Sequence, residues 1–259
     1  MEKQRVSGEA KPRLQSVKRV FVKIAARVGV SPTIITAVRT VELSMLFAVG
    51  IAGAGIAVFL GLASEMTEGE THAIDRWLLL TLRNPSDLSD PIGPPWLDRV
   101  MLDITALGGI AILTLITLAA VGFLVLIRKR LEAWIVLLSV GFGVVVTNLL
   151  KLAYGRERPG FAPRDLVIDS LSFPSGHAMM SAVVYLTLGA LLARSHPDRR
   201  LRIYLIALSM FMTAVVGFSR VYLAVHWPTD VLAGWAVGAV WAICSWVMMS
   251  WLQTRQTAA

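Results

Sequence analysis

Cysteine is almost absent from this chain of 259 residues. The single cysteine, Cys244, lies within a long apolar run, so an intrachain disulfide and a thiolate metal cluster are both excluded. An HExxH motif, a cluster of carboxylates and a Cys/His ligand pattern are also missing. We therefore predict that the chemistry of the chain needs no cofactor and no metal ion.

Acidic residues are fewer than basic ones, with 17 Asp and Glu against 25 Lys and Arg and a formal net charge of +8. A basic surplus of this size is one indication of nucleic-acid binding. Here, however, the basic residues gather beside long apolar runs, where anionic lipid and membrane topology account for them. The sequence therefore indicates a membrane as partner and no nucleic acid.

Long apolar runs dominate what is present. Apolar residues make up 56% of the chain, the mean hydropathy is +0.66, and several runs reach about 20 residues, the length of a helix that crosses a bilayer. The strands of a membrane barrel would alternate apolar and polar residues, and these runs do not. We predict an all-α fold, a bundle of six transmembrane helices. The spans are expected near residues 42–63, 104–127, 132–151, 174–194, 203–223 and 229–252.

Residues 1–41 form a separate basic segment in this interpretation. The first 40 residues hold nine Lys and Arg against two acids, and apolar residues recur among them at helical spacing. The pattern is typical of an amphipathic helix that lies on the cytoplasmic membrane surface and binds anionic lipid. Its spaced apolar residues are Leu14, Val17, Phe21, Ile24 and Val28. Residues 42–259 are then the six-span membrane domain.

The charges in the connections predict the topology. Two links, Arg128–Arg130 and Arg194–Arg202, are basic, whereas residues 64–103 contain eight acids and three arginines. The positive-inside rule places the basic links and both termini in the cytoplasm and the acidic loop outside. Within that loop, we expect "THAIDRWLLLTL" to form a short interfacial helix. The chain is thus predicted to be a multi-pass protein of the cell (inner) membrane.

Three polar stretches lie at span ends that this topology places on the extracytoplasmic side. "KLAYGRERP" (Lys151–Pro159) follows the third span, and "FPSGH" (Phe173–His177) precedes the fourth. "SRVYLAVHWPTD" (Ser219–Asp230) joins the fifth span to the sixth. Ionisable groups within a membrane segment are costly and usually functional. Their convergence on one face predicts a single site within residues 151–230.

These stretches carry the groups that bind phosphate. Lys151, Arg158 and Arg220 supply three cations, and a guanidinium group can bind two phosphate oxygens at once. Pro174 is suited to the first position of a helix, which would point the free N–H groups of the first turn at an anion. Those N–H groups belong to Ser175, Gly176 and His177, and the absence of a side chain at Gly176 lets the backbone come close.

Two histidines and an aspartate go beyond binding. A neutral imidazole is a competent nucleophile toward phosphorus when its other nitrogen donates to an acceptor that fixes the tautomer. If Pro228 begins a helix, Asp230 lies in the first turn and reaches back to His226. His177 can protonate the leaving oxygen and later activate water. The pattern predicts two phosphoryl transfers through a phosphohistidine, with the cations stabilising the transition state.

The same positions resemble the three-part signature of the type-2 phosphatidic acid phosphatase superfamily of integral-membrane lipid phosphatases. The matching residues are Lys151, Arg158 and Pro159, then Pro174 to His177, then Ser219, Arg220, His226 and Asp230. The resemblance implies His226 as nucleophile, Asp230 as its orienting group and His177 as acid and base. It implies phosphate binding by Lys151, Arg158, Ser175, Gly176 and Arg220.

A lipid phosphate is the substrate that the resemblance implies, and its identity is left open. The commonest substrates of bacterial membrane members are undecaprenyl diphosphate, phosphatidylglycerol phosphate, phosphatidic acid and lipid A phosphates, and family frequency favours the first. Transfer of the phosphate to a second lipid is an alternative. From another class, a phospholipid transporter or scramblase would use the same cations for binding, although transporter sites usually lie near the bilayer midplane. The oligomeric state is also left open.

Single residues in these stretches have simpler interpretations. Lys151 and Arg220 can extend to the headgroups, as basic residues at span ends do. Asp230 and Ser175 can be ordinary helix caps. The joint pattern favours a phosphate site over these alternatives. Arg156, between Lys151 and Arg158, is interpreted as a member of a structural ion pair in preference to a catalytic group, and contact with a second phosphate is the alternative.

Overall fold

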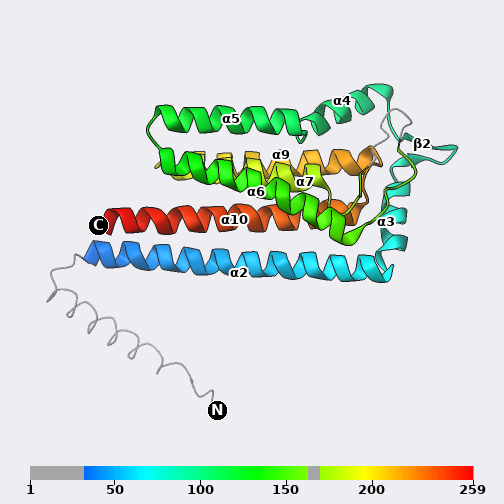
Figure 1. Ribbon diagram of the computed structural model, residues 1–259. Helices are drawn as coiled ribbons and strands as arrows, with labels where there is room; N and C mark the ends of the chain where they lie inside the picture. Colours follow the sequence, from blue (N-terminus) through cyan, green and yellow to red (C-terminus); the bar gives the residue numbers. More distant parts are fainter. Residues whose placement is uncertain (1–31, 163–169, 259) are drawn as a thin grey trace, which may run out of the picture. The chain divides into compact units, whose positions relative to one another are not determined.

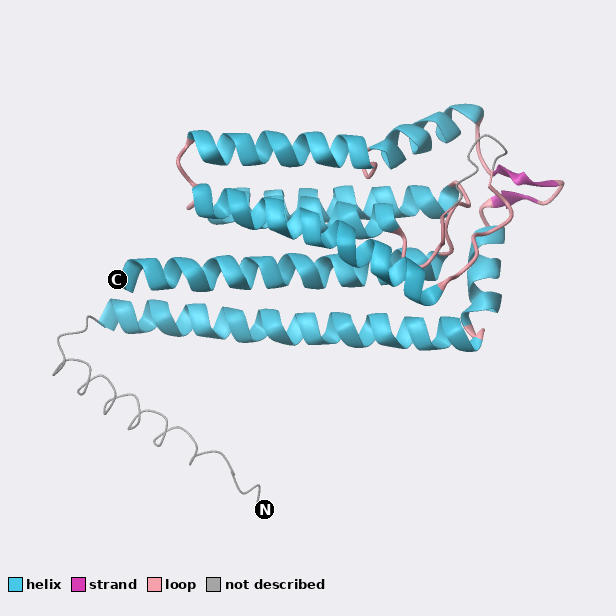
Figure 2. Ribbon diagram, viewed as in Figure 1, coloured by secondary structure: helices cyan, strands magenta, loops and turns pink. Residues whose placement is uncertain are grey.

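The computed structural model describes residues 32–162 and 170–258 (Figures 1 and 2). Most of the basic segment predicted for residues 1–41, with its lipid-binding face, lies outside the described residues. The helices are α2 (Pro32–Glu68), α3 (Thr71–Leu80), α4 (Pro95–Ala106), α5 (Ile110–Leu126), α6 (Arg130–Tyr154), α7 (Gly176–Ser181), α8 (Thr187–Arg194), α9 (Arg199–Tyr222) and α10 (Pro228–Ala258). A π-helical turn, Ala182–Leu186, joins α7 to α8. The predicted helical membrane protein is therefore confirmed in its main features.

Within residues 32–162 and 170–258, five helical segments are long and apolar enough to cross a membrane. They are Ser44–Glu68, Arg130–Tyr154, Gly176–Arg194, Arg199–Tyr222 and Pro228–Leu252. The span expected near residues 104–127 is divided between α4 and α5, which are bent by 45° at their junction. The pair makes a sixth span only if it crosses the membrane as one unit, so the six-span count stays a prediction.

The acidic segment between α2 and α4 contains more regular structure than expected. The helix predicted from "THAIDRWLLLTL" is present as α3, and its location at the membrane interface stays a prediction. After it, β1 (Arg83–Asn84) and β2 (Asp87–Pro91) form an antiparallel hairpin that the all-α prediction omitted. Its turn is supported by the Asn84 side chain, which accepts the Ser86 N–H at 3.2 Å. Strands this short carry no periodic signal in the sequence.

The chain divides after Ala48 into two units. The first is Met1–Ala48, whose described part is the beginning of α2. The second, Val49–Ala259, contains all the other elements. Within it, α10 packs against α6, α7, α8 and α9, and the C-terminal ends of α6 and α9 lie at the same end as the beginnings of α7 and α10 (Figure 1). The three polar stretches are therefore brought together.

Close packing of α10 on the α7–α8 segment depends on Gly238. A Cβ atom at this position would lie 2.6 Å from the backbone oxygen of Met179 and 2.6 Å from the Cβ of Ala182. We therefore expect Gly238→Ala to lower the free energy of unfolding by about 1–3 kcal/mol through overpacking. Thermal unfolding in detergent measures the loss. Gly122→Ala on α5 is the matched control, since its Cβ would meet no described atom within 4 Å; equal melting of the two variants would contradict the prediction.

Candidate active site

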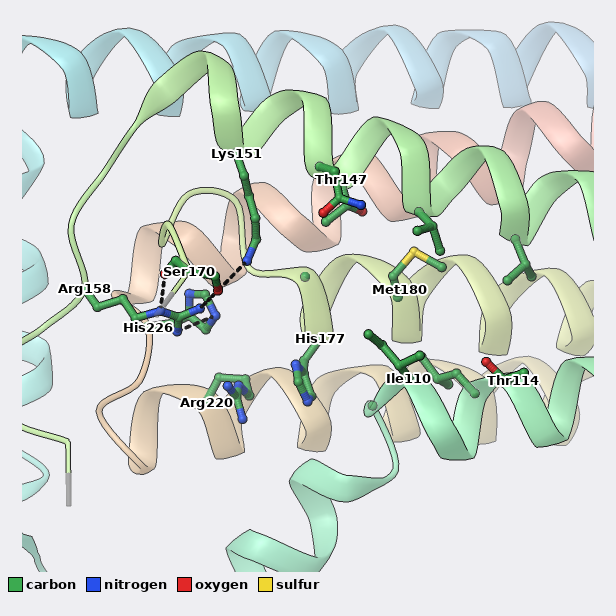
Figure 3. Close-up of a pocket in the computed structure, with 16 residues that line it drawn as sticks. Ile110, Thr114, Thr147, Lys151, Arg158, Ser170, His177, Met180, Arg220 and His226 are labelled. Carbon is green, nitrogen blue, oxygen red and sulfur yellow. Dashed lines mark hydrogen bonds between the residues drawn. The ribbon is translucent and has the colours of Figure 1, made fainter. Parts of the chain in front are cut away.

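A cavity of about 320 Å³ opens where the three polar stretches meet. Six of the eight predicted site residues line it, and Figure 3 shows side chains from α6, α7, α9 and two loops directed toward the same space. The six are Lys151, Arg158, Gly176, His177, Arg220 and His226. Ser175 and Asp230 lie behind the wall, and both are completely buried. The rest of the wall is mainly apolar: it includes Ile110, Leu113, Val140, Val144 and Met180, together with the polar residues Thr114, Thr147 and Asn148.

The ends of α6 and α9 set the directions of the first and third stretches. Helix α6 ends at Tyr154 and is capped by Gly155, whose φ of +60° suits glycine and whose N–H donates to the Lys151 carbonyl at 3.1 Å. Helix α9 ends with Ala224 at a φ of +51°. There, the N–H of Val225 donates to the Arg220 carbonyl at 3.2 Å, the long bond of a Schellman motif. This tight end turns the chain so that His226 faces the cavity.

The start of α7 differs in two details from the sequence prediction. Ser175 is the N-cap, with its Oγ 3.5 Å from the N–H of Ala178, so Pro174 precedes the cap and does not occupy the first helical position. The N–H of Ser175 was expected to be free, but it donates to the Asp230 carbonyl at 2.9 Å. The next two N–H groups, of Gly176 and His177, have no hydrogen-bond partner among the described residues and border the cavity.

His226 is held at both ring nitrogens. Its Nδ1 lies 3.3 Å from Asp230 Oδ2 and 3.3 Å from Ser172 Oγ, whereas Nε2 lies 3.2 Å from Arg158 Nη1. Because a guanidinium can only donate, we assign the proton to Nδ1 and the lone pair to Nε2. Burial lowers the pKa of His226 to about 3, opposed by the hydrogen bond and charge of Asp230. The imidazole is therefore neutral at physiological pH.

The cations of the cavity are partly paired with hydroxyl groups. Ser170 Oγ accepts from Arg158 Nη2 at 2.9 Å and from Lys151 Nζ at 3.4 Å (Figure 3). Arg220 Nη1 donates to Thr105 Oγ1 on α4 at 2.8 Å, and its buried Nε has no partner among the described residues. One oxygen atom can thus contact two cations at once. Neither hydroxyl was identified from the sequence, since single Ser and Thr residues carry no pattern.

Behind His226 lies a buried ionic cluster. Arg156 Nη1 is 2.6 Å from Asp230 Oδ1, and Arg156 Nη2 is 2.6 Å from Asp75 Oδ2. The Ser172 hydroxyl donates to Asp230 Oδ2 as well. The ion pair predicted for Arg156 is therefore confirmed, with Asp75 and Asp230 as its partners. Asp75 and Ser172 were missed, because nothing in the sequence links them to the stretches that they contact.

His177 completes the described cavity wall without a hydrogen bond from its ring to another described residue. A Cβ atom at Gly108, in the junction of α4 and α5, would lie 3.4 Å from the His177 side chain. The junction thus packs directly beside this histidine. In the part of the chain that the structure describes, no three His, Cys, Asp or Glu side chains are grouped so that they could hold a metal ion.

Comparison with known proteins gives consistent matches. Residues 132–254 match the family model of the PAP2 superfamily. Phosphatidylglycerophosphatase B of Bacillus subtilis (strain 168) is 40% identical over 152 residues, which are 57% of this chain and 72% of that protein. An undecaprenyl-diphosphatase of Sulfolobus acidocaldarius is 30% identical over 141 residues, 52% of this chain and 61% of the relative.

Among solved structures, the transmembrane PAP2 type phosphatidylglycerolphosphate phosphatase from Bacillus subtilis is similar to this chain with a TM-score of 0.64. The superposition covers 79% of this chain and 96% of that one, at 28% sequence identity. The similarity therefore extends beyond the motif-bearing residues to most of the helices.

Proposed function

Because this chain belongs to the PAP2 superfamily, we propose that it is a membrane lipid phosphatase that hydrolyses a lipid phosphomonoester or diphosphate through a phosphohistidine intermediate. The observation that carries the proposal is the environment of His226. A neutral imidazole with its lone pair on Nε2 faces a cavity lined by Lys151, Arg158 and Arg220. This combines a nucleophile with three cations for an anionic phosphoryl group.

In the first step, Nε2 of His226 attacks phosphorus and the bond from phosphorus to the lipid-side oxygen breaks. His177 donates a proton to that oxygen, which leaves as an alcohol or a lipid phosphate. Asp230 stabilises the positive imidazole that forms, because Oδ2 accepts the hydrogen bond from Nδ1. Arg158 contacts Nε2 before substrate binds and moves to a phosphoryl oxygen when the nucleophile attacks.

In the second step, His177 removes a proton from a water molecule, and the resulting hydroxide attacks phosphorus. The bond between phosphorus and Nε2 breaks, inorganic phosphate leaves, and neutral His226 is restored. Lys151, Arg158 and Arg220 bind the equatorial oxygens in both steps. The N–H groups of Gly176 and His177 add donors at the positive end of α7, and Ser175 supports them as the N-cap.

The cavity wall supports a lipid as the substrate. From the charged end, the lining continues over apolar side chains of α5 and α6, such as Leu113, Val140 and Val144. An acyl or polyprenyl chain is compatible with such a wall, whereas a sugar phosphate would leave it uncovered. Among the candidate substrates, the names of the relatives favour phosphatidylglycerol phosphate, which we therefore place first. Undecaprenyl diphosphate, which family frequency favours, is second. By the positive-inside rule, we place the reaction on the extracytoplasmic face.

The test is phosphate release by the purified protein in detergent. The panel contains phosphatidylglycerol phosphate, undecaprenyl diphosphate, phosphatidic acid and a lipid A diphosphate. Rapid hydrolysis of one lipid supports the proposal. Phosphate that appears on a second lipid and not in solution identifies a phosphotransferase. If no lipid reacts while labelled lipid still crosses reconstituted vesicles, the chain is a transporter and the proposal fails.

Metal chelation should leave the reaction intact. In the proposed mechanism, the charge that a metal ion would neutralise is neutralised by three cationic side chains, and the nucleophile is an imidazole. We expect turnover in about 10 mM EDTA, a large excess over trace metal, to match the rate without EDTA. Phosphate release is measured before and after chelation, with added Mg²⁺ as the control. Loss of activity that Mg²⁺ restores would contradict the mechanism.

A further inference from the structure

We propose that Asp75 and Arg156 are positioning residues of the nucleophile, which fix the orientation and the charge of Asp230 and act through it on His226. This inference rests on the proposed function. Neither residue belongs to the signature positions, and Asp75 comes from α3, outside the residues that carry the three stretches. Both act from behind the cavity wall and touch no atom of the substrate.

The contacts form a continuous chain from α3 to the nucleophile. Asp75 Oδ2 is 2.6 Å from Arg156 Nη2, Arg156 Nη1 is 2.6 Å from Asp230 Oδ1, and Asp230 Oδ2 is 3.3 Å from His226 Nδ1. The side chains of Asp75, Arg156 and Asp230 are 0%, 4% and 0% exposed. Each hydrogen bond is therefore shielded from water, and a group that lost its partner could not form a hydrogen bond to solvent instead.

Asp75 also holds the beginning of α10. Its Oδ1 accepts the N–H of Thr229 at 2.9 Å, and its Oδ2 accepts the Thr229 hydroxyl at 2.6 Å. Arg156 Nη1 donates to the same hydroxyl at 2.8 Å. Thr229 precedes Asp230 in the first turn of α10. The Asp75 carboxylate therefore restrains the backbone next to Asp230 and also holds Arg156, the ionic partner of Asp230. Such a double restraint defines the direction from which Oδ2 meets the imidazole.

The cluster also has a defined charge. Two carboxylates and one guanidinium give it a net charge of −1, and no further cation hydrogen bonds to it among the described residues. His226 gains a positive charge when it is phosphorylated, so a net negative cluster stabilises the intermediate more than the neutral imidazole. Neutralising Asp75 would leave Arg156 and Asp230 with a net charge of zero. Removing Arg156 would leave two buried carboxylates with a net charge of −2, so that one of them takes up a proton and Asp230 no longer presents a full negative charge to His226.

The experiment compares Asp75→Asn, Arg156→Gln and the double variant with wild type, on the lipid that the panel identifies. Rates are expressed per active site, counted as trapped phosphoenzyme after rapid quenching with alkali. We expect each single variant to lower kcat by about 10- to 100-fold with KM changed by less than about threefold. The cavity cations that bind substrate remain in place in all three variants. The double variant restores the net charge of −1, and we expect it to be at least about tenfold faster than Arg156→Gln.

Two exposed residues provide matched controls. Asp103→Asn and Arg99→Gln make the same charge changes on the surface of α4, where both side chains are exposed, and should leave kcat unchanged. Variants that lose yield or melting temperature but retain the wild-type kcat per site would overturn the inference and leave a structural role. If the two single losses simply multiply, they predict a certain kcat for the double variant. A measured kcat at or below that value would overturn the inference as well. Inactivity of wild type on every lipid would instead refute the proposed function.

Discussion

Replacement of His226 by asparagine is expected to reduce lipid phosphatase activity by about 10⁴-fold or more, because it removes the atom that attacks phosphorus. Asparagine retains a polar group beside Asp230 and Ser172, which limits the cost of leaving buried partners unpaired. Lys151, Arg158 and Arg220 remain, so binding of the lipid phosphate should persist. The loss is therefore expected in kcat and not in substrate affinity.

A covalent intermediate distinguishes this prediction from a loss of folding. Wild type, incubated briefly with ³²P-labelled lipid and quenched with alkali, should retain label that acid removes, as a phosphohistidine does. His226→Asn should retain none, although it still binds the lipid. His196→Asn is the control, since His196 is exposed and its Nδ1 contacts only the carbonyl of Leu192 among the described atoms. More than about 1% residual activity in the His226 variant, with label still bound, would rule out this nucleophile.

The meeting of distant motifs could be predicted because the membrane restricts how helices are arranged. Once the spans are assigned, alternate helix ends must share a face, and Lys151, His177 and Arg220 then converge. The contact between His226 and Asp230 was predictable for a local reason. Pro228 begins α10, which brings a carboxylate four residues along the chain back toward the imidazole at 3.3 Å.

The supporting groups could not be predicted in the same way. Asp75 contacts Thr229 across 154 positions of sequence, and nothing in "THAIDRWLLLTL" separates a buried acid from one on the solvent face of an amphipathic helix. Ser172 lies only two residues before Pro174, yet its contact with Asp230 depends on how α10 packs against the segment before α7. Both contacts are tertiary, and periodicity and capping rules describe only local structure.

The break in the segment expected to form the second span has a similar explanation. Residues 104–127 are almost continuously apolar, and hydropathy cannot distinguish a straight helix from two helices that meet at an angle. In the structure, α4 ends before Gly108 and Gly109, and Tyr185 Oη donates to the Leu107 carbonyl at 2.7 Å. That bond satisfies a backbone acceptor that the break releases. The break brings Thr105 to Arg220 and Gly108 to His177, so it contributes directly to the cavity wall.

Arg220→Gln is the second substitution with a large expected effect, a decrease in kcat/KM of about 10²- to 10³-fold. The Arg220 side chain is buried at the charged end of the cavity, and its Nε has no partner among the described residues. Arg220 lines the cavity, so its positive charge lies close to an oxygen whose negative charge grows in the transition state. Glutamine retains a donor for Thr105 but removes the positive charge. Lysine should not restore the rate, because a single ammonium cannot replace the planar fork that contacts Thr105 and phosphate together.

Orthovanadate provides an independent measure of the same interaction, since it adopts the five-coordinate geometry of phosphoryl transfer. Arg220→Gln should weaken vanadate inhibition by a factor similar to the loss in kcat/KM, because both report binding of the transition state. Thr105→Val leaves the charge and removes only the bond that orients it, so its loss should be about tenfold or less. Arg99→Gln on the exposed face of α4 should change neither quantity. If Arg220→Gln raised KM alone and left vanadate inhibition intact, Arg220 would bind the lipid phosphate equally in ground and transition states, and Lys151 and Arg158 would carry the catalytic stabilisation.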